Sequence, residues 1–420
     1  MIPAAAMAQG NPGPYGGLFG RTPNRAGQDH TTVEVRSTLG VMFDNALLPA
    51  EDQAGKLQSG FSSGAGVNLL FQHATERLTG TLSGGASRQE YFTTPGFGTN
   101  LFGADARLKA RLATRLEAEA VAAYVHSPYF QFLRDFGTTT LTPSDNLMPY
   151  SSYAAEMLEN ETIDAIGSLT GQLSKRSRLS ASVNRRQTRF AHHPDHDFVL
   201  DGYHGSWNMQ LRRDLSLRAG YGRERIEQRG TERGLFDHEI IDVGIDFNRE
   251  LSVARRTTLG LMTSTSFFKG ADTERRFRVN AAARLSKQFR RTWRATAYAS
   301  RNTEFWPGFV EPVLTDSVGA SLGGMFSRRV NWMAGVVGSK GEYGFSDLSG
   351  FKQLAATSGL HIALSRHFGL YSQYVAYWYE IPPGSSALAL VPRLDRQTVA
   401  IGLTAYLPLY TKMRPPRDSR

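Results

Sequence analysis

One short segment of the chain carries metal-ligating side chains close together, His192-His193-Pro194-Asp195-His196-Asp197. Imidazole nitrogens and carboxylate oxygens can bind Zn²⁺ or Ni²⁺. The segment falls where we expect a loop, so no strand geometry would fix the ligands, and we predict neither a metal nor a cofactor. The chain contains no Cys, so it has no disulfide framework and no thiolate metal site.

Groupings that support catalysis are missing from the sequence. It contains no Ser-His-Asp/Glu grouping, Gly-rich phosphate loop or HExxH motif. Barrel-shaped hydrolases exist, but here no nucleophile and base stand at a defined spacing. We therefore predict no catalytic residues and expect that the protein is not an enzyme.

Most charged residues belong to a pattern in which apolar and polar residues alternate. Residues 203–211 and 215–221 alternate in this way on either side of a polar turn, Arg212-Arg213-Asp214. Such alternation places every second side chain on one face of a β-strand. One face of this hairpin is apolar with aromatic ends, and the other is polar and charged. Similar hairpins recur over most of the chain, from Thr32 to Leu407.

The connections between these strands alternate in length. Short connections carry Arg and Ser, and long connections carry Gly, Pro, Asp and aromatic residues. This pattern predicts an all-β fold, a single up-and-down antiparallel transmembrane β-barrel of about 18 strands with short periplasmic turns and long extracellular loops. An open sheet edge would leave backbone groups unsatisfied in lipid, so the sheet must close. A soluble sandwich or propeller is the alternative, but its strands are nearer 5–6 residues long.

The segment from 102 to 126 is ambiguous. Leu108, Leu112 and Leu116 are spaced four residues apart, as on a soluble helix. Small and apolar residues also alternate there with Asp105, Arg107 and other charged residues, and we prefer two strands.

Composition limits the domains and partners. With 420 residues and a net charge of +10, the chain has Arg and Lys spread singly along strands and in pairs at short turns. We therefore expect no nucleic-acid partner. No apolar run approaches about 18 residues, which excludes a helical membrane protein. We predict three parts. Residues 1–30 form a flexible tail in which Ala6-Met7-Ala8 marks a signal-peptide remnant; the alternative is an Ala-rich disordered end. Residues 31–410 form a transmembrane barrel, and residues 411–420 form a basic tail.

If the apolar face points to lipid, the charged face must line a lumen. Charges at mid-strand are costly against lipid and are stable in a water-filled lumen. Arg111 would face Glu117, and Lys109 would face Glu119, either as pairs that stiffen the wall or as a charged ring that filters solutes. The predicted lumen-lining residues are Arg36, Arg107, Lys109, Arg111, Glu117, Glu119, Asp164, Arg186, Arg218, Arg278, Arg284 and Arg294.

The longest connection, Ser127 to Glu161, is rich in aromatic residues and carboxylates. Long loops in ordered proteins are commonly functional. Folded inward, this loop would narrow the pore and offer aromatic faces to sugar rings; the alternative is an exposed cap. The predicted constriction residues are Tyr129, Phe132, Arg134, Asp135, Phe136, Asp145, Tyr150 and Tyr153.

The chain resembles bacterial outer-membrane β-barrel porins of the group associated with exopolysaccharide export. The resemblance covers about Thr32 to Leu407 and rests on hairpins such as QLSKRSRLSASV, LSKQFRRTWRATAYA, MFSRRVNWMAGV and ALSRHFGLYSQY. The last strand, VAIGLTAYLPL, resembles the terminal signal read by the barrel-assembly machinery. It departs from that signal at Ala405 and at Pro408, where an aromatic finish is usual.

From the resemblance we expect a passive outer-membrane channel that exports polysaccharide or oligosaccharide. The alternatives are a general diffusion porin for small solutes and a non-conducting anchoring barrel. The expected location is the bacterial outer membrane, reached through the periplasm. The expected partners are outer-membrane lipid and lipopolysaccharide, the barrel-assembly machinery, polysaccharide cargo and export proteins.

Overall fold

A computed structural model of the chain describes residues 29–47, 58–92, 98–128, 130–131, 154–156, 158–229, 235–250, 257–270, 276–289, 292–305, 312–343, 350–381 and 392–413. Among these residues the one helical segment is the 3-10 turn η4, Pro194–His196. No helix in the described part of the chain is long and apolar enough to cross a membrane. The predicted terminal tails fall mostly outside the described residues, so their prediction stays open.

The described residues form long antiparallel strands and two short ones. The first half of the chain contains β1 His30–Leu47, β2 Gln58–Ala74, β3 Leu78–Tyr91, β4 Gly98–Ala113, β5 Leu116–Ser127, β6 Phe130–Gln131, β7 Ala154–Glu156, β8 Asn160–Gln172, β9 Ser177–Phe190 and β10 Phe198–Arg212. The second half contains β11 Leu215–Gln228, β12 Leu235–Glu250, β13 Thr257–Gly270, β14 Arg276–Phe289, β15 Trp293–Glu304, β16 Val313–Ser327, β17 Val330–Tyr343, β18 Lys352–Ala363, β19 Phe368–Glu380 and β20 Arg393–Met413.

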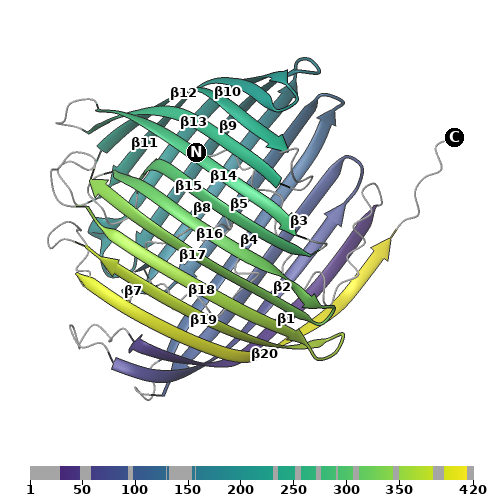
Figure 1. Ribbon diagram of the computed structural model, residues 1–420, viewed down its shortest axis with the longest axis vertical. Coiled ribbons are helices and arrows are strands. Elements are labelled where there is room, and N and C mark those ends of the chain that lie inside the picture. The colour runs from purple at the N-terminus through teal and green to yellow at the C-terminus, as the bar shows by residue number, and fades with distance from the viewer. Residues whose placement is uncertain are drawn as a thin grey trace.

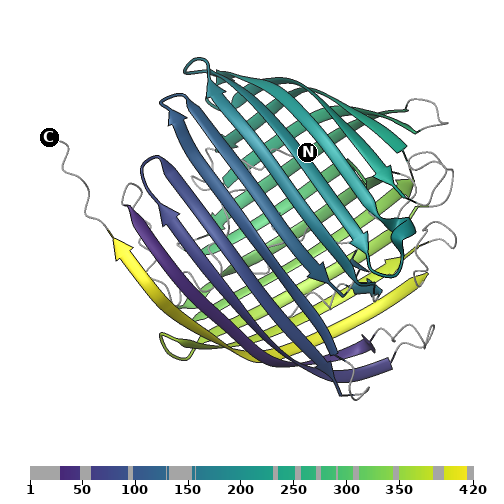
Figure 2. The same ribbon diagram turned by 180° about the vertical axis from the view of Figure 1, so that it is seen from behind.

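The long strands close into one barrel (Figures 1 and 2). Each pairs antiparallel with its neighbours in the chain, in a sheet of 18 strands. The first strand, β1, pairs with β2 on one side and with the last strand, β20, on the other, which leaves no free edge. The predicted up-and-down barrel is therefore confirmed, and the segment 102–126 forms β4 and β5 rather than a helix. The two short strands, β6 and β7, pair with each other in a separate sheet.

The strand alternation separates an apolar outer face from a polar inner face. Large apolar side chains such as Leu39, Val183 and Val318 point outward and are among the most exposed apolar side chains of the described residues, at 60%, 61% and 65%. Their neighbours in sequence face the interior and are mostly Ser, Thr, Gly or charged. In a membrane, a closed sheet pairs all its backbone hydrogen-bonding groups internally, and an apolar exterior places no polar side chains against the lipid hydrocarbon.

The two ends of the barrel differ. We call the end with the short connections, such as the turn between β10 and β11, the turn end, and the opposite end the loop end; β1 begins and β20 finishes at the turn end. Outward aromatic side chains cluster at the turn end, where Trp293 lies 5.0 Å from Phe326 and 6.0 Å from Trp332 between ring centroids. Aromatic side chains at this level mark a membrane interface.

Outward charges form ion pairs at the loop end. Arg301 pairs with Asp316 at 2.7 Å, and Lys340 pairs with Glu342 at 3.4 Å. Such charges are stable among lipid head groups and costly in hydrocarbon. They also explain why several strands start earlier than their apolar alternation indicates. β12, for example, begins at Leu235, although its uninterrupted run of outward apolar residues begins only at Ile241.

Candidate functional site

Charged side chains line the inner face of β4 and β5 as ion pairs. The backbone register places Lys109 opposite Glu119 and Arg111 opposite Glu117. The ion pairs form one step diagonally from this register: Arg107 contacts Glu119 at 2.5 Å, and Lys109 contacts Glu117 at 3.0 Å. The side chains are partly exposed. Because they point into the barrel, this part of the lumen is accessible to water.

The neighbouring wall continues this paired pattern. Asp164 on β8 and Arg186 on β9 are register partners, and Arg186 Nε donates to Asp164 Oδ1 at 2.5 Å. Ser83 on β3 donates a hydrogen bond to Asp105 on β4. The carboxylates of this wall are therefore engaged by neighbouring donors.

The wall formed by β14 and β15, eight strands along the sheet from β4 and β5, carries basic residues of another kind. Arg278, Arg284 and Arg294 alternate with outward residues such as Val279 and Leu285, so they face inward from β14 and β15. Arg284 and Arg294 are exposed, and no acidic partner pairs with either within the described residues. In a sheet of 18 strands, this distance places the two walls on opposite sides of the lumen.

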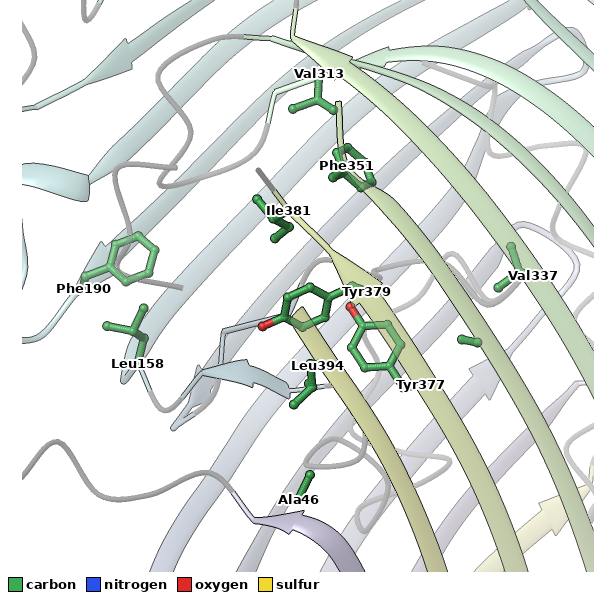
Figure 3. Close-up of a cluster of buried hydrophobic side chains, with 11 residues drawn as sticks. Ala46, Leu158, Phe190, Val313, Val337, Phe351, Tyr377, Tyr379, Ile381 and Leu394 are labelled. Atoms are coloured by element: carbon green, nitrogen blue, oxygen red, sulfur yellow. The ribbon is translucent and has the colours of Figure 1, made fainter. Parts of the chain in front are cut away.

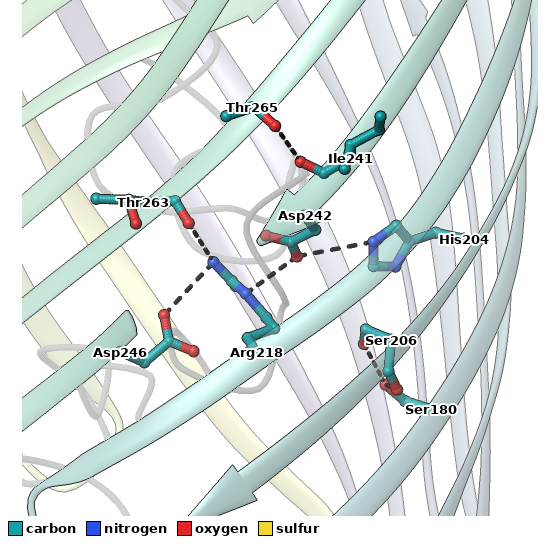
Figure 4. Close-up of polar contacts among 9 residues, drawn as sticks. All are labelled: Ser180, His204, Ser206, Arg218, Ile241, Asp242, Asp246, Thr263 and Thr265. Carbon is teal, nitrogen blue, oxygen red and sulfur yellow. Dashed lines mark hydrogen bonds and ion pairs between the residues drawn. The ribbon is translucent and has the colours of Figure 1, made fainter. Parts of the chain in front are cut away.

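Arg218 lies flat against the inner wall and is buried (Figure 4). Its Nε lies 3.0 Å from Asp242 Oδ2, its Nη2 lies 3.4 Å from Asp246 Oδ1, and Nη2 also donates to the Thr263 carbonyl at 2.9 Å. His204 Nε2 lies 3.8 Å from Asp242. A guanidinium held by two carboxylates and a carbonyl is a fixed part of the wall.

Glycine makes room for this network. Gly244 is the register partner of Arg218, and a Cβ there would collide with the Thr263 carbonyl oxygen. Four positions beyond Arg218 on β11, a Cβ on Gly222 would lie 2.8 Å from the His204 ring. The bare backbone lets long polar side chains lie along the wall instead of crossing the lumen.

Nearer the loop end, Glu224 and His238 form a second buried pair. They are register partners, and His238 Nδ1 lies 2.9 Å from Glu224 Oε2. Both side chains are almost fully buried. Their burial shows that the lumen is more crowded here than beside β4 and β5.

The loop end of the lumen is narrowed by apolar side chains (Figure 3). One cluster of buried residues joins opposite walls: Leu158 and Phe190 beside β8 and β9, and Tyr379, Ile381 and Leu394 around β19 and β20. A second cluster contains Phe198, Leu200, Ile226 and Phe236 on β10 to β12. The inner face therefore carries buried apolar clusters at the loop end, beside buried polar pairs such as Glu224 and His238, whereas the charged pairs on β4 and β5 are partly exposed.

A buried ion pair closes the seam between the first and last strands. Arg396 on β20 donates from Nε to both Asp44 oxygens, at 3.2 Å and 2.9 Å, and a further bond runs from Nη2 to Oδ2. Asp44 Oδ1 also accepts the backbone N–H of Ala46 at 3.0 Å. The pair fixes the point where the two ends of the sheet meet.

Sequence analysis did not identify four of these residues, His204, His238, Asp44 and Arg396. Asp44 lies within β1 and Arg396 within β20, at positions that apolar alternation alone does not mark. The signal that identifies them is register with neighbouring strands, which becomes visible only after the barrel is closed.

The remaining predicted site residues have two outcomes. Arg36 faces inward and lies 3.4 Å from Glu34, two positions away on the same strand. The predicted constriction residues all lie outside the described residues, so the constriction loop stays a prediction: Tyr129, Phe132, Arg134, Asp135, Phe136, Asp145, Tyr150 and Tyr153.

The His-rich segment forms a compact connection between β9 and β10. The His193 and His196 rings lie 5.8 Å apart between centroids. Asp197 accepts the backbone N–H of Phe190 at 3.0 Å, so its carboxylate helps to close the loop. Burial, together with the neighbouring His193, lowers the pKa of His196. Within the described ranges, no three His, Cys, Asp or Glu side chains are arranged to hold a metal ion.

Among known proteins, the chain is similar only to solved structures. No protein-family model and no curated protein matches the chain. Pseudomonas aeruginosa OccK8 (OprE) matches with 9% identity and a TM-score of 0.44 over 90% of this chain and 98% of that one. OccK2 (OpdF) from the same organism, in complex with glucuronate, matches with 10% identity and a TM-score of 0.46 over 90% and 98%. Acinetobacter baumannii OccAB4 matches with 13% identity and a TM-score of 0.41 over 91% and 98%.

These comparisons give no support to the predicted link with exopolysaccharide export. The chain's own geometry determines what can be concluded about its class. The sheet is closed, its exterior is apolar between an aromatic cluster and a charged rim, and its interior carries hydrated charge. The chain is a closed 18-stranded antiparallel β-barrel with the surface pattern of an outer-membrane-type barrel.

Proposed function

We propose that the barrel is a passive channel for small hydrophilic solutes, with a preference for anions. The observation that carries the proposal is the contrast between two lumen walls. On β4, β5, β8 and β9, carboxylates lie beside basic or hydroxyl partners. On β14 and β15, Arg284 and Arg294 are exposed to the lumen, and the described residues hold no acidic partner for either.

This contrast favours anions for an electrostatic reason. Paired charges produce a field that falls off quickly, whereas an unpaired guanidinium keeps a positive potential in the adjacent water. Charged side chains lining a pore select ions of the opposite sign. A solute passing Arg284 and Arg294 would exchange water for weak contacts, as a conducting channel requires.

The narrowed loop end supports small solutes over a polymer. The buried cluster that joins Leu158 and Phe190 to Tyr379 and Ile381 restricts the space on the path through the barrel. The expected carbohydrate path depended on aromatic residues in the loop between β5 and β8, which lie outside the described residues. Small-solute diffusion is therefore the better-supported function, and the proposal assigns no chemical step to any residue.

The test is ion selectivity of the purified full chain in planar bilayers under a tenfold KCl gradient. The proposal predicts discrete conductance steps and a reversal potential displaced toward the chloride equilibrium potential. Replacing Arg284 and Arg294 together by Glu should reverse the sign of this displacement. The matched control is Arg301→Glu, which changes an outward arginine on the same strand, β15, and should leave selectivity unchanged.

Two results would overturn the proposal. Protein that inserts without conductance steps would be an anchoring barrel instead. A reversal potential that does not respond to Arg284→Glu and Arg294→Glu would show that the unpaired arginines do not set selectivity.

A further inference from the structure

The outer surface of the barrel has a hollow of about 970 Å³ over β4, β5 and β8 to β12. These strands run side by side across the front of Figure 2. Small outward residues form its floor at one end, where Ala106, Ala122 and Ala165 follow one another in register across β4, β5 and β8. Larger neighbours, Leu108 and Val183, form its sides. The surface is recessed here because the outward side chains are the methyl groups of Ala, whereas Leu, Val or Ile occupy many other outward positions.

The same register row continues into charged residues. Ala165 is opposite Arg185, Arg185 is opposite Asp201, and Asp201 is opposite Arg225, which is opposite Asp237. All four charged residues line the hollow. The hollow therefore has an apolar half on β4 to β8 and a charged half on β9 to β12.

The two halves lie at different depths in the membrane. Ala106 lies eight residues from Gly98, the loop-end start of β4, whereas Asp237 lies two residues from Leu235, the loop-end start of β12. The apolar half is thus at the level of the hydrocarbon, and the charged half is at the level of the head groups. Tyr203, which also lines the hollow, lies on β10 two residues toward the turn end from Asp201, as expected for an aromatic side chain at the interface.

We propose that this hollow binds one phosphorylated, multiply acylated glycolipid of the outer leaflet. The acyl chains lie over the alanine floor, and a phosphate contacts the guanidinium groups of Arg185 and Arg225. The phosphate would thereby add contacts to arginines that are held only in weak, exposed ion pairs. Arg185 lies 3.4 Å from Asp201, and Arg225 lies 3.0 Å from Glu227, with both arginine side chains 61% exposed. Such pairs contribute little, and a guanidinium has five donors, enough to keep its carboxylate and also bind phosphate.

The polarity of the hollow favours a lipid over a second copy of the chain. A lipid in the outer leaflet has its charged end toward the loop end and its acyl chains toward the membrane centre. The hollow has the same order, from Asp237 and Arg225 down to Ala165 and Ala106. A protein partner would need a matching ridge with its own graded charge.

The test is native mass spectrometry of the full chain in detergent, titrated with bisphosphorylated hexa-acyl lipid A. Replacing Arg185 and Arg225 together by Gln removes the phosphate contacts and should weaken binding about tenfold. The matched control is Arg301→Gln, because Arg301 is also an exposed, ion-paired arginine of the loop-end rim but lies outside the hollow. The control should bind lipid A as the wild type does.

A second pair of variants tests the floor. Ala165→Phe fills the hollow and should reduce binding, whereas Ala297→Phe adds the same ring to another outward position, on β15. Equal binding by all variants, or equal loss in Arg301→Gln, would overturn the proposal. So would a dimer or trimer that is lost with Ala165→Phe and binds no lipid A, since the occupant would then be a second copy. Conductance plays no part in these measurements, so failure of the channel proposal would not affect them.

Discussion

Replacing Asp44 by Asn should destabilise the barrel strongly, because it leaves the buried positive charge of Arg396 without its carboxylate partner. The Asp44 and Arg396 side chains are 0% and 1% exposed, and they join β1 to β20 where the sheet closes. Asn keeps the shape of the side chain and removes its charge. Removing one partner of a buried pair costs about 3–5 kcal/mol, which is roughly two to four powers of ten in the unfolding equilibrium.

The matched control is Asp316→Asn at the loop-end rim. Arg301 donates to Asp316 at 2.7 Å and 2.8 Å, so the geometry is comparable, but the side chains are 64% and 52% exposed. We expect a loss of about 0.2–1 kcal/mol there. The assay is urea unfolding of the full chain in detergent micelles, followed by tryptophan fluorescence. Adding Arg396→Gln to Asp44→Asn should recover part of the loss, because no charge is then buried. Equal losses for the two single variants would refute the reasoning.

Two further predictions concern the inner wall and the β9–β10 connection. Gly244→Ala should lower the free energy of unfolding by about 1–3 kcal/mol in the same urea assay, because the new methyl group meets the Thr263 carbonyl. In the control, Gly335→Ala, the nearest atom to the new methyl group is 3.5 Å away, so the loss should be far smaller. Similar losses for the two variants would contradict the wall packing described above. Because the pKa of His196 is lowered in the folded loop, unfolded chain binds the proton more readily, so the loop should lose stability as the pH falls through about 6.5. An NMR titration of the His196 ring showing half-protonation at or above that pH would exclude this behaviour.

The barrel could be predicted because one physical requirement repeats along the chain. Lipid outside and water inside impose period-two alternation on each strand, and residues such as Leu39 and Val183 follow it. The alternation becomes unreliable where lipid gives way to head groups. At the loop end, outward residues such as Asp237 and Arg301 are charged. The sequence pattern there resembles that of a loop, although the backbone is still paired with the neighbouring strands.

Side-chain partners were less predictable than strands. The hairpin register placed Lys109 opposite Glu119, but the twist of the sheet brings Arg107 to Glu119 and Lys109 to Glu117. Asp44 and Arg396 are separated by 352 residues, and no local pattern relates them. Only closure of the whole sheet brings them together, so the seam could not be inferred from either segment alone.

The inner wall places its charges in two energetic situations, and this division connects stability with transport. Arg218 and Arg396 are buried beside carboxylates; removing a partner from either would leave a charge in a poorly hydrated place, so these pairs fix the shape of the wall. Arg284 and Arg294 are exposed to lumen water, so their charge costs the fold little and remains available to a passing anion. Substitutions at buried pairs should therefore alter folding before conductance, whereas substitutions at the exposed arginines should alter selectivity in a barrel that still folds.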